Sequence, residues 1–189
     1  MIRIGILGNI GSGKSYVAKN FGYPVFNADY EVTKLYKKDK KIFKKLKKNL
    51  PKYIYSFPIN KNQITKAILS NKVNLQKIIS IVHLEIRKIL KLFLKKNRDK
   101  KVIILDIPLL LENKINNKND ILVFVDSKKV EIEKRLKKRL NFNRKLINKF
   151  RKIQFSSSYK KRRSNFIIKN NFKKKSLNKS IKKILNEIL

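Results

Sequence analysis

The chain has 189 residues, no cysteine and a formal net charge of +38 at pH 7, from 50 Lys and Arg against 12 Asp and Glu. This length suits one domain with a sizeable core, and the lack of cysteine excludes disulfides, thiolate catalysis and zinc–thiolate sites. No apolar run reaches the roughly 18–20 residues of a membrane span, and the N-terminus is not a signal peptide, so we expect a cytoplasmic protein without a membrane partner.

The first motif is a phosphate-binding loop at the N-terminus. Residues 2–7 predict a short buried strand, residues 8–15 match G-x-x-x-x-G-K-[ST], and a helix can open at Tyr16. The glycines let backbone N–H groups point at phosphate oxygens, so a ligand-free glycine turn is the weaker interpretation. Lys14 would reach the β- and γ-phosphates of ATP, and the Ser15 hydroxyl would bind Mg²⁺. The predicted ATP-binding residues are Gly11, Ser12, Gly13, Lys14, Ser15 and Tyr16.

Beyond this loop, strands and helices alternate along the chain. We expect a strand at 23–29, a basic helical stretch from about 30 to 50, a connection at 51–62 and helices at 63–70 and 75–96. Strands follow at 102–106 and 121–126, helices at 129–140 and 144–155, a strand at 166–168 and then a closing helix. This order predicts an α/β fold with a five-stranded parallel sheet flanked by helices.

The positive charge is spread along nearly the whole chain, mostly as lysine among many Asn and Ile residues. A nucleic-acid-binding surface would use such charge to neutralise phosphates. No nucleic-acid-binding motif accompanies it, however, and Lys, Asn and Ile share A/T-rich codons. We therefore favour a solvated lysine coat and expect no specific nucleic-acid partner, although the field should speed the arrival of polyanionic substrates.

Three of the acids, Asp29, Asp106 and Asp126, end predicted strands, at the edge where open parallel sheets bind ligands. For Asp126, which precedes Ser127 and a helix, we favour a helix cap. Asp106 could hold Mg²⁺, directly or through water, or serve the structure alone. Asp29 would lie beside the phosphate loop, able to accept a proton from an attacking hydroxyl.

Arginine is concentrated in one part of the chain, because six of the nine arginines fall between residues 135 and 163. Their fork-shaped, permanently charged side chains suit phosphate oxygens. Such a cluster on a helical segment predicts a lid over ATP, at about residues 135–160. Arg139 is the candidate phosphate contact, and most of the others are expected to be ordinary surface charges.

The neighbouring sequence does not decide the roles of two further residues, His83 and Glu112. His83, the single histidine, lies in an amphipathic helix, where a packing or hydrogen-bonding role is the commoner one. Glu112 follows Pro108 and three leucines, and it could cap a helix or touch a substrate.

Taken together, these segments resemble the dephospho-coenzyme A kinase family. The P-loop alone would fit hundreds of families, but Val-Phe-Asn-Ala-Asp at 25–29 and Asp-Ile-Pro-Leu-Leu-Leu-Glu at 106–112 make the resemblance specific. The other matching pieces are Ile-Val-His at 81–83, Arg135, Arg139 and Gln154 in the lid, and Phe-Ile-Ile-Lys-Asn at 166–170.

The resemblance implies that the chain phosphorylates the ribose 3′-hydroxyl of dephospho-CoA with ATP and Mg²⁺, the last step of coenzyme A synthesis. It implies a P-loop kinase core at about 1–30, 100–130 and 165–189, a helical CoA-binding region at about 31–97, and the lid. Asp29 falls at the position of the base, Lys14 and Arg139 complete the catalytic set, and His83 and Glu112 fall near the substrate. We expect a monomer or a weak homo-oligomer.

The chain departs from the family pattern at five positions, which are Tyr16 for Thr, Asn27 for Asp, Leu84 for Pro, Leu140 for Asp and Lys169 for Asp. Two other functions stay open. One is another small-molecule kinase of this fold, such as a nucleoside or nucleotide kinase. The other is a P-loop protein that binds nucleic acid, which would show ATPase activity stimulated by DNA or RNA.

Overall fold

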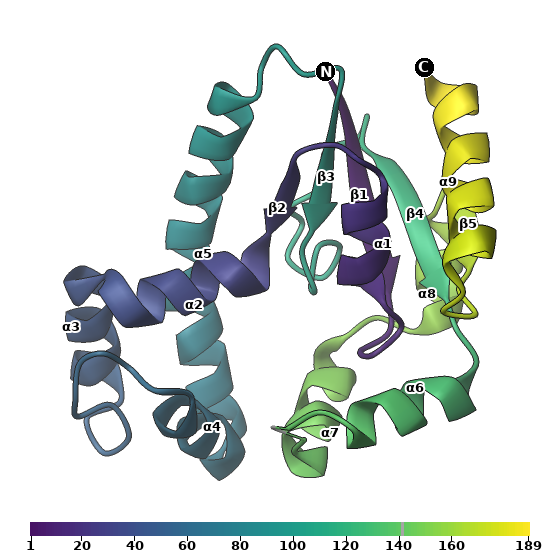
Figure 1. The fold of residues 1–189 in the computed structure, drawn as a ribbon. Coiled ribbons are helices and arrows are strands. Elements are labelled where there is room, and N and C mark those ends of the chain that lie inside the picture. The colour runs from purple at the N-terminus through teal and green to yellow at the C-terminus, as the bar shows by residue number, and fades with distance from the viewer. Residues whose placement is uncertain (141) are drawn as a thin grey trace. The chain divides into compact units, whose positions relative to one another are not determined.

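The computed structural model describes residues 1–140 and 142–189. Their contacts divide the chain into two compact units (Figure 1). The sheet unit comprises residues 1–27, 97–143 and 150–189, and the helical unit comprises residues 28–96 and 144–149.

Within the described residues, the sheet unit contains five parallel strands in the order β2-β3-β1-β4-β5. They are β1 (Ile2–Gly8), β2 (Val25–Asn27), β3 (Val102–Asp106), β4 (Ile121–Asp126) and β5 (Phe166–Lys169). The predicted five-stranded parallel sheet is therefore confirmed. Because β3 and β4 flank β1, their carboxyl ends reach the edge from which the loop after Gly8 leaves.

One face of the sheet is buried under α1 (Lys14–Asn20) and α9 (Lys174–Ile188), which share a core with the strands. Side chains alternate between the two faces of a strand, so every second residue contributes to this core. Its buried members are Ile4, Ile6, Val17, Ala18, Phe21, Val102, Ile104, Val123, Val125, Ile168, Leu177, Ile181 and Ile184. Their removal from water stabilises the sheet that carries the site.

The segment after β3 packs closely against β1 because Gly5 has no side chain. A Cβ at Gly5 would lie 2.6 Å from Leu110 Cδ2 and 2.9 Å from Leu122 Cδ2. Leu110 is fully buried there. This close approach positions the turns that lead to Glu112.

Three further helices follow β4, namely α6 (Lys129–Lys137), α7 (Arg144–Ile153) and α8 (Ser157–Arg162). The helix α8 was not expected from the sequence, and it starts where the Ser156 side chain accepts a hydrogen bond from the Tyr159 N–H at 3.2 Å. The predicted helix at 144–155 ends at Ile153, so Gln154 and Phe155 lie in the connection between the two helices.

The helical unit contains α2 (Ala28–Lys38), α3 (Lys40–Asn49), α4 (Lys61–Ser70) and α5 (Lys72–Lys96). The helical stretch expected at about 30–50 is confirmed, and it consists of two helices, because the Asp39 carboxylate accepts the N–H groups of Lys41 and Ile42 at 2.8 and 2.9 Å and starts the second one. The apolar stripe of α5 is buried at Leu75, Ile78, Val82, Ile86 and Leu90, as predicted. Among the helices that the structure describes, none has the length and apolarity to cross a membrane.

The strand predicted at 23–29 is shorter in the structure. β2 ends at Asn27, and Ala28 and Asp29 open α2, so the prediction that Asp29 ends a strand is wrong. An acid in the first turn of a helix is stabilised by the positive end of the helix dipole, which favours helix over strand at this position.

Candidate active site

The P-loop curls around its own lysine before α1 begins. Lys14 Nζ donates hydrogen bonds to the carbonyls of Gly8 at 3.1 Å and Asn9 at 2.9 Å, and the Ser12 N–H donates to the Asn9 carbonyl at 3.1 Å. Gly13 stands at the N-cap of α1 and supplies no side-chain cap. The first N–H groups of this helix therefore face the loop at the positive end of its dipole, an arrangement that binds phosphate.

Two P-loop glycines are required by their surroundings. Gly11 and Gly13 have φ angles of 88° and 92°, which strain residues with a side chain. A Cβ at Gly11 would lie 2.9 Å from Leu136 Cγ of α6, and one at Gly13 would lie 2.6 Å from Asn170 Nδ2. Both α6 and the turn after β5 therefore pack directly on the loop.

Side chains from other loops hold the middle of the P-loop. The Ser12 carbonyl accepts hydrogen bonds from Ser127 Oγ and from Asn170 Nδ2, both at 2.9 Å. Asn170 is buried, and its Oδ1 accepts the Phe172 N–H at 3.0 Å. Asn170 and Ser12 are 158 positions apart, so no local pattern in the sequence predicts their contact. Only the family resemblance points to Asn170.

Asp106 is buried at the carboxyl end of β3, level with Asn27 in the neighbouring strand β2. Asn27 Nδ2 donates a hydrogen bond to Asp106 Oδ2 at 2.6 Å. An ionised Asp at position 27 could not donate this bond, so the departure from the family pattern gives Asp106 a neutral donor where the family has a second acid.

Asp126 does not cap a helix, so the interpretation favoured from the sequence is wrong. Its carboxylate pairs with Lys161 Nζ of α8 at 2.8 Å, while the N-cap position of α6 is Lys128, without a side-chain cap. Asp126 precedes that cap position along the chain, and its carboxylate reaches a cation instead. The Asp126 carbonyl also accepts the Asn170 N–H at 2.7 Å, which ties β4 to the turn after β5.

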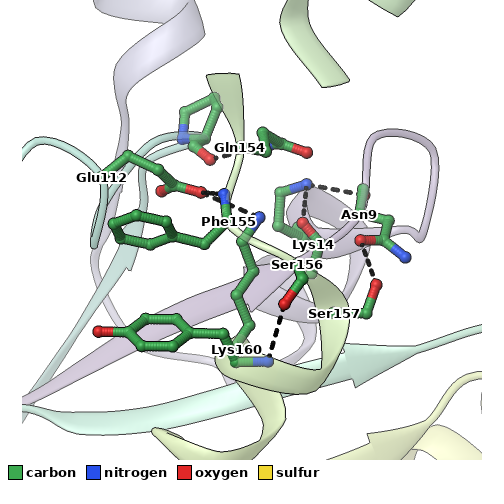
Figure 2. Close-up of polar contacts among 11 residues, drawn as sticks. Asn9, Lys14, Glu112, Gln154, Phe155, Ser156, Ser157 and Lys160 are labelled. Atoms are coloured by element: carbon green, nitrogen blue, oxygen red, sulfur yellow. Dashed lines mark hydrogen bonds and ion pairs between the residues drawn. The ribbon is translucent and has the colours of Figure 1, made fainter. Parts of the chain in front are cut away.

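Glu112 is engaged by the segment that follows α7 (Figure 2). Its Oε1 lies 3.1 Å from Lys160 Nζ and accepts the Phe155 N–H at 2.8 Å. The two side chains of the ion pair are only 8% and 2% exposed. Gln154 Nε2 donates to the Pro108 carbonyl at 3.3 Å, beside the same turn. Lys160 was not among the residues expected from the sequence, because one buried lysine has no local signal in so lysine-rich a chain.

The arginines have different surroundings. Arg135 stacks over the Phe172 ring at 4.1 Å from its centroid, and Arg151 pairs with Glu133 at 2.6 Å. Arg139 lies just after the C-cap of α6 and is exposed, with its backbone N–H bonded to the Leu136 carbonyl. The phosphate contact predicted for Arg139 therefore stays a prediction.

The other two predicted substrate residues, Asp29 and His83, belong to the helical unit. Asp29 is exposed in the first turn of α2, and its carbonyl accepts Thr33 Oγ1 at 2.8 Å. His83 is half-buried on α5. Burial lowers the pKa of His83 below its ordinary value of 6.5, and the positive charge of Arg87 lowers it further. Its imidazole is therefore neutral at pH 7, able both to donate and to accept a hydrogen bond.

Comparison with known proteins identifies the family of this chain. A family model described as dephospho-CoA kinase matches residues 2–176. The dephospho-CoA kinase of Wolbachia pipientis wMel is 34% identical over 190 residues, covering 98% of this chain and 97% of that protein. The crystal structure of TT1252 from Thermus thermophilus has a TM-score of 0.81 and 26% identity, covering 100% of this chain and 98% of its own. A dephospho-CoA kinase from Campylobacter jejuni shares the fold, with a TM-score of 0.59, 20% identity, and coverage of 98% of this chain and 96% of its own. This chain belongs to the dephospho-CoA kinase family.

Proposed function

We propose that this chain transfers the γ-phosphoryl group of ATP to the ribose 3′-hydroxyl of dephospho-CoA, which completes coenzyme A. The main support is a P-loop that is already curled and held by neighbouring side chains, in a chain that matches dephospho-CoA kinases over residues 2–176. A nucleoside or nucleotide kinase would share the loop, but the family match favours dephospho-CoA as the acceptor.

The P-loop supplies the phosphate contacts. Backbone N–H groups of residues 11–16 would face the phosphates, and Lys14 would exchange the carbonyls of Gly8 and Asn9 for the β- and γ-phosphate oxygens. A charge-assisted bond to phosphate is stronger than a bond to a neutral carbonyl, which favours this exchange when ATP enters. Tyr16 would contribute its backbone N–H, since it lacks the short hydroxyl side chain that the family has there.

The residues that would hold Mg²⁺ are Ser15 and Asp106, and their hydroxyl and carboxylate oxygens are donors that this hard cation prefers. No group of three or more His, Cys, Asp or Glu side chains that could hold a metal occurs within residues 1–140 and 142–189. Mg²⁺ commonly takes one or two protein oxygens and completes its shell with phosphates and water. When bound with ATP, Mg²⁺ neutralises charge on the phosphates. Asn27 would keep one Asp106 oxygen fixed by its hydrogen bond.

On the acceptor side, we propose that the helical region at 31–97 binds dephospho-CoA and that Asp29 aligns and deprotonates the 3′-hydroxyl. His83 would offer a neutral hydrogen-bonding group to the substrate. The lid would span about 135–160, a range in which position 141 lies outside the described residues, and Arg139 would contact the phosphates. Because phosphoryl transfer has a loose transition state, alignment by these groups should contribute more than proton removal.

The direct test is to incubate the purified protein with ATP, Mg²⁺ and dephospho-CoA and to weigh the product. We expect dephospho-CoA to gain one phosphoryl group and a panel of nucleosides to gain none. ATPase activity stimulated by DNA or RNA, without a phosphorylated small molecule, would support the nucleic-acid alternative. We also propose that the protein is a monomer or a weak homo-oligomer and that it acts in the cytoplasm. Size-exclusion chromatography in the same buffer would test the oligomeric state.

A further inference from the structure

A short segment after α7 is tied to three separate parts of the sheet unit, namely the turn after β3, the end of β4 and the P-loop. We name residues 154–161 the brace segment. Gln154 and Phe155 bond to the turn after β3, Lys160 pairs with Glu112 in that turn, and Lys161 pairs with Asp126 at the end of β4. Ser157 Oγ donates to Asn9 Oδ1 of the P-loop at 3.0 Å (Figure 2).

The Lys160–Glu112 pair is the anchor of this segment. Both charges are almost fully removed from water, at 2% and 8% side-chain exposure. A buried charge that loses its partner is strongly unfavourable, so the pair resists separation. Since Glu112 Oε1 also accepts the Phe155 N–H, it holds the brace segment at both its start and its helix.

Ser157 lies on this anchored helix and contacts Asn9, a P-loop residue whose carbonyl accepts two hydrogen bonds from within the loop. The Asn9 carbonyl accepts both the Ser12 N–H and Lys14 Nζ. The orientation of Asn9 therefore sets where that carbonyl points, and with it the curl of the loop. The bond from Ser157 fixes the Asn9 carboxamide from outside the loop.

We propose that Ser157 is a positioning residue for ATP binding, which acts through Asn9 and is held in place by the Lys160–Glu112 anchor. Its hydroxyl keeps the P-loop in the phosphate-binding curl, so that ATP does not have to order the loop on entry. This inference rests on the proposed function only in so far as the P-loop binds ATP, whatever the acceptor is.

The test compares Ser157→Ala with Ser158→Ala, a matched control on the same short helix. Ser158 is exposed, and its hydroxyl lies 3.0 Å from Ser156 Oγ. ATP·Mg²⁺ affinity is measured by titration calorimetry without an acceptor. Ser157→Ala should raise the Kd for ATP about three- to tenfold, as expected for one lost hydrogen bond. Ser158→Ala should keep the parent Kd, and the Tm of Ser157→Ala should fall by no more than about 2–4 °C, so that the variant remains folded during the titration. Ser157→Thr, which retains the hydroxyl, should restore most of the affinity.

A double-mutant cycle with Asn9→Ala tests whether Ser157 affects ATP binding through Asn9. If Ser157 acts through Asn9, then Ser157→Ala should change the ATP Kd less than about twofold in the Asn9→Ala background. Equal Kd values for Ser157→Ala and the parent, or additive effects in the cycle, would overturn the proposal. A protein that binds ATP with these differences but leaves dephospho-CoA unphosphorylated would contradict the proposed function alone.

Discussion

The candidate residues of the two units differ in how they are held. In the sheet unit, the P-loop and its neighbours form a connected set of hydrogen bonds, and Asp106, Glu112 and Lys160 are almost completely enclosed. In the helical unit, Asp29 is exposed in the first turn of α2, and His83 is half-buried in a long helix.

This difference indicates a division of labour. A phosphate site must present several donors at once, and fixing them before ATP arrives avoids the loss of entropy on binding. A group that aligns an acceptor hydroxyl has its geometry set mainly by the substrate it touches. Substitutions in the sheet unit should therefore affect folding or ATP binding, whereas substitution of Asp29 in the helical unit should affect turnover alone.

The largest effect on folding is expected for the anchor. Lys160→Met leaves Glu112 buried without its partner, and it should lower the free energy of unfolding by about 3–5 kcal/mol. Lys161→Met on the same helix breaks the Lys161–Asp126 pair, whose side chains are 39% and 36% exposed. That control should lose only about 0–1 kcal/mol. Urea unfolding monitored by circular dichroism measures both, and equal losses would show that the Lys160 pair is not an anchor.

Lys14→Ala is expected to act on both binding and turnover. It removes the cation that we propose contacts the β- and γ-phosphates, and a lost donor of this kind commonly raises the barrier by about 3–4 kcal/mol. We expect kcat to fall and the Kd for ATP to rise, with the Tm close to that of the parent. Steady-state kinetics measures kcat and calorimetry measures the Kd for ATP. An unchanged kcat would contradict the proposed role of Lys14 in catalysis.

Asp29→Asn tests the expectation that the helical unit contributes to turnover and not to ATP binding. The exposed carboxylate makes a small contribution to folding, but loss of a base commonly slows a reaction about 10²-fold or more. We predict a fall in kcat with the ATP affinity nearly unchanged. Asp39→Asn, which keeps a cap at the start of α3, serves as a control in the same unit. Near-normal turnover by the Asp29 variant would exclude it as the base.

The smallest effect is expected for His83 and depends on pH. Because burial lowers its pKa in the folded state, the unfolded chain takes up the proton first as the pH falls through 6.5. His83 therefore lowers stability progressively below pH 6.5, and His83→Gln should remove that contribution. Unfolding at about pH 7.5 and about pH 5.5, on either side of this range, should show a smaller acid loss for the variant than for the parent. A parallel loss in both proteins would mean that the His83 pKa is not lowered.

The amino-acid sequence by itself determined the features that are encoded locally. The P-loop, the strands β3 and β4 and the apolar stripe of α5 follow from neighbouring residues, because strand and helix periodicity and a glycine-rich loop are short-range properties. The family resemblance then predicts that these segments form a kinase fold, because the motifs occur along this chain in the same order as in the family.

Tertiary structure alone decided which distant side chains meet. Asn27 and Asp106 are 79 positions apart, and Ser157 and Asn9 are 148 positions apart. The same holds for Lys160, which resembles every other lysine in the chain until the fold buries it against Glu112. Such partners depend on the path of the chain between them, and a carboxylate such as Asp126 pairs with whichever cation that path brings near, not with the helix that follows it in sequence.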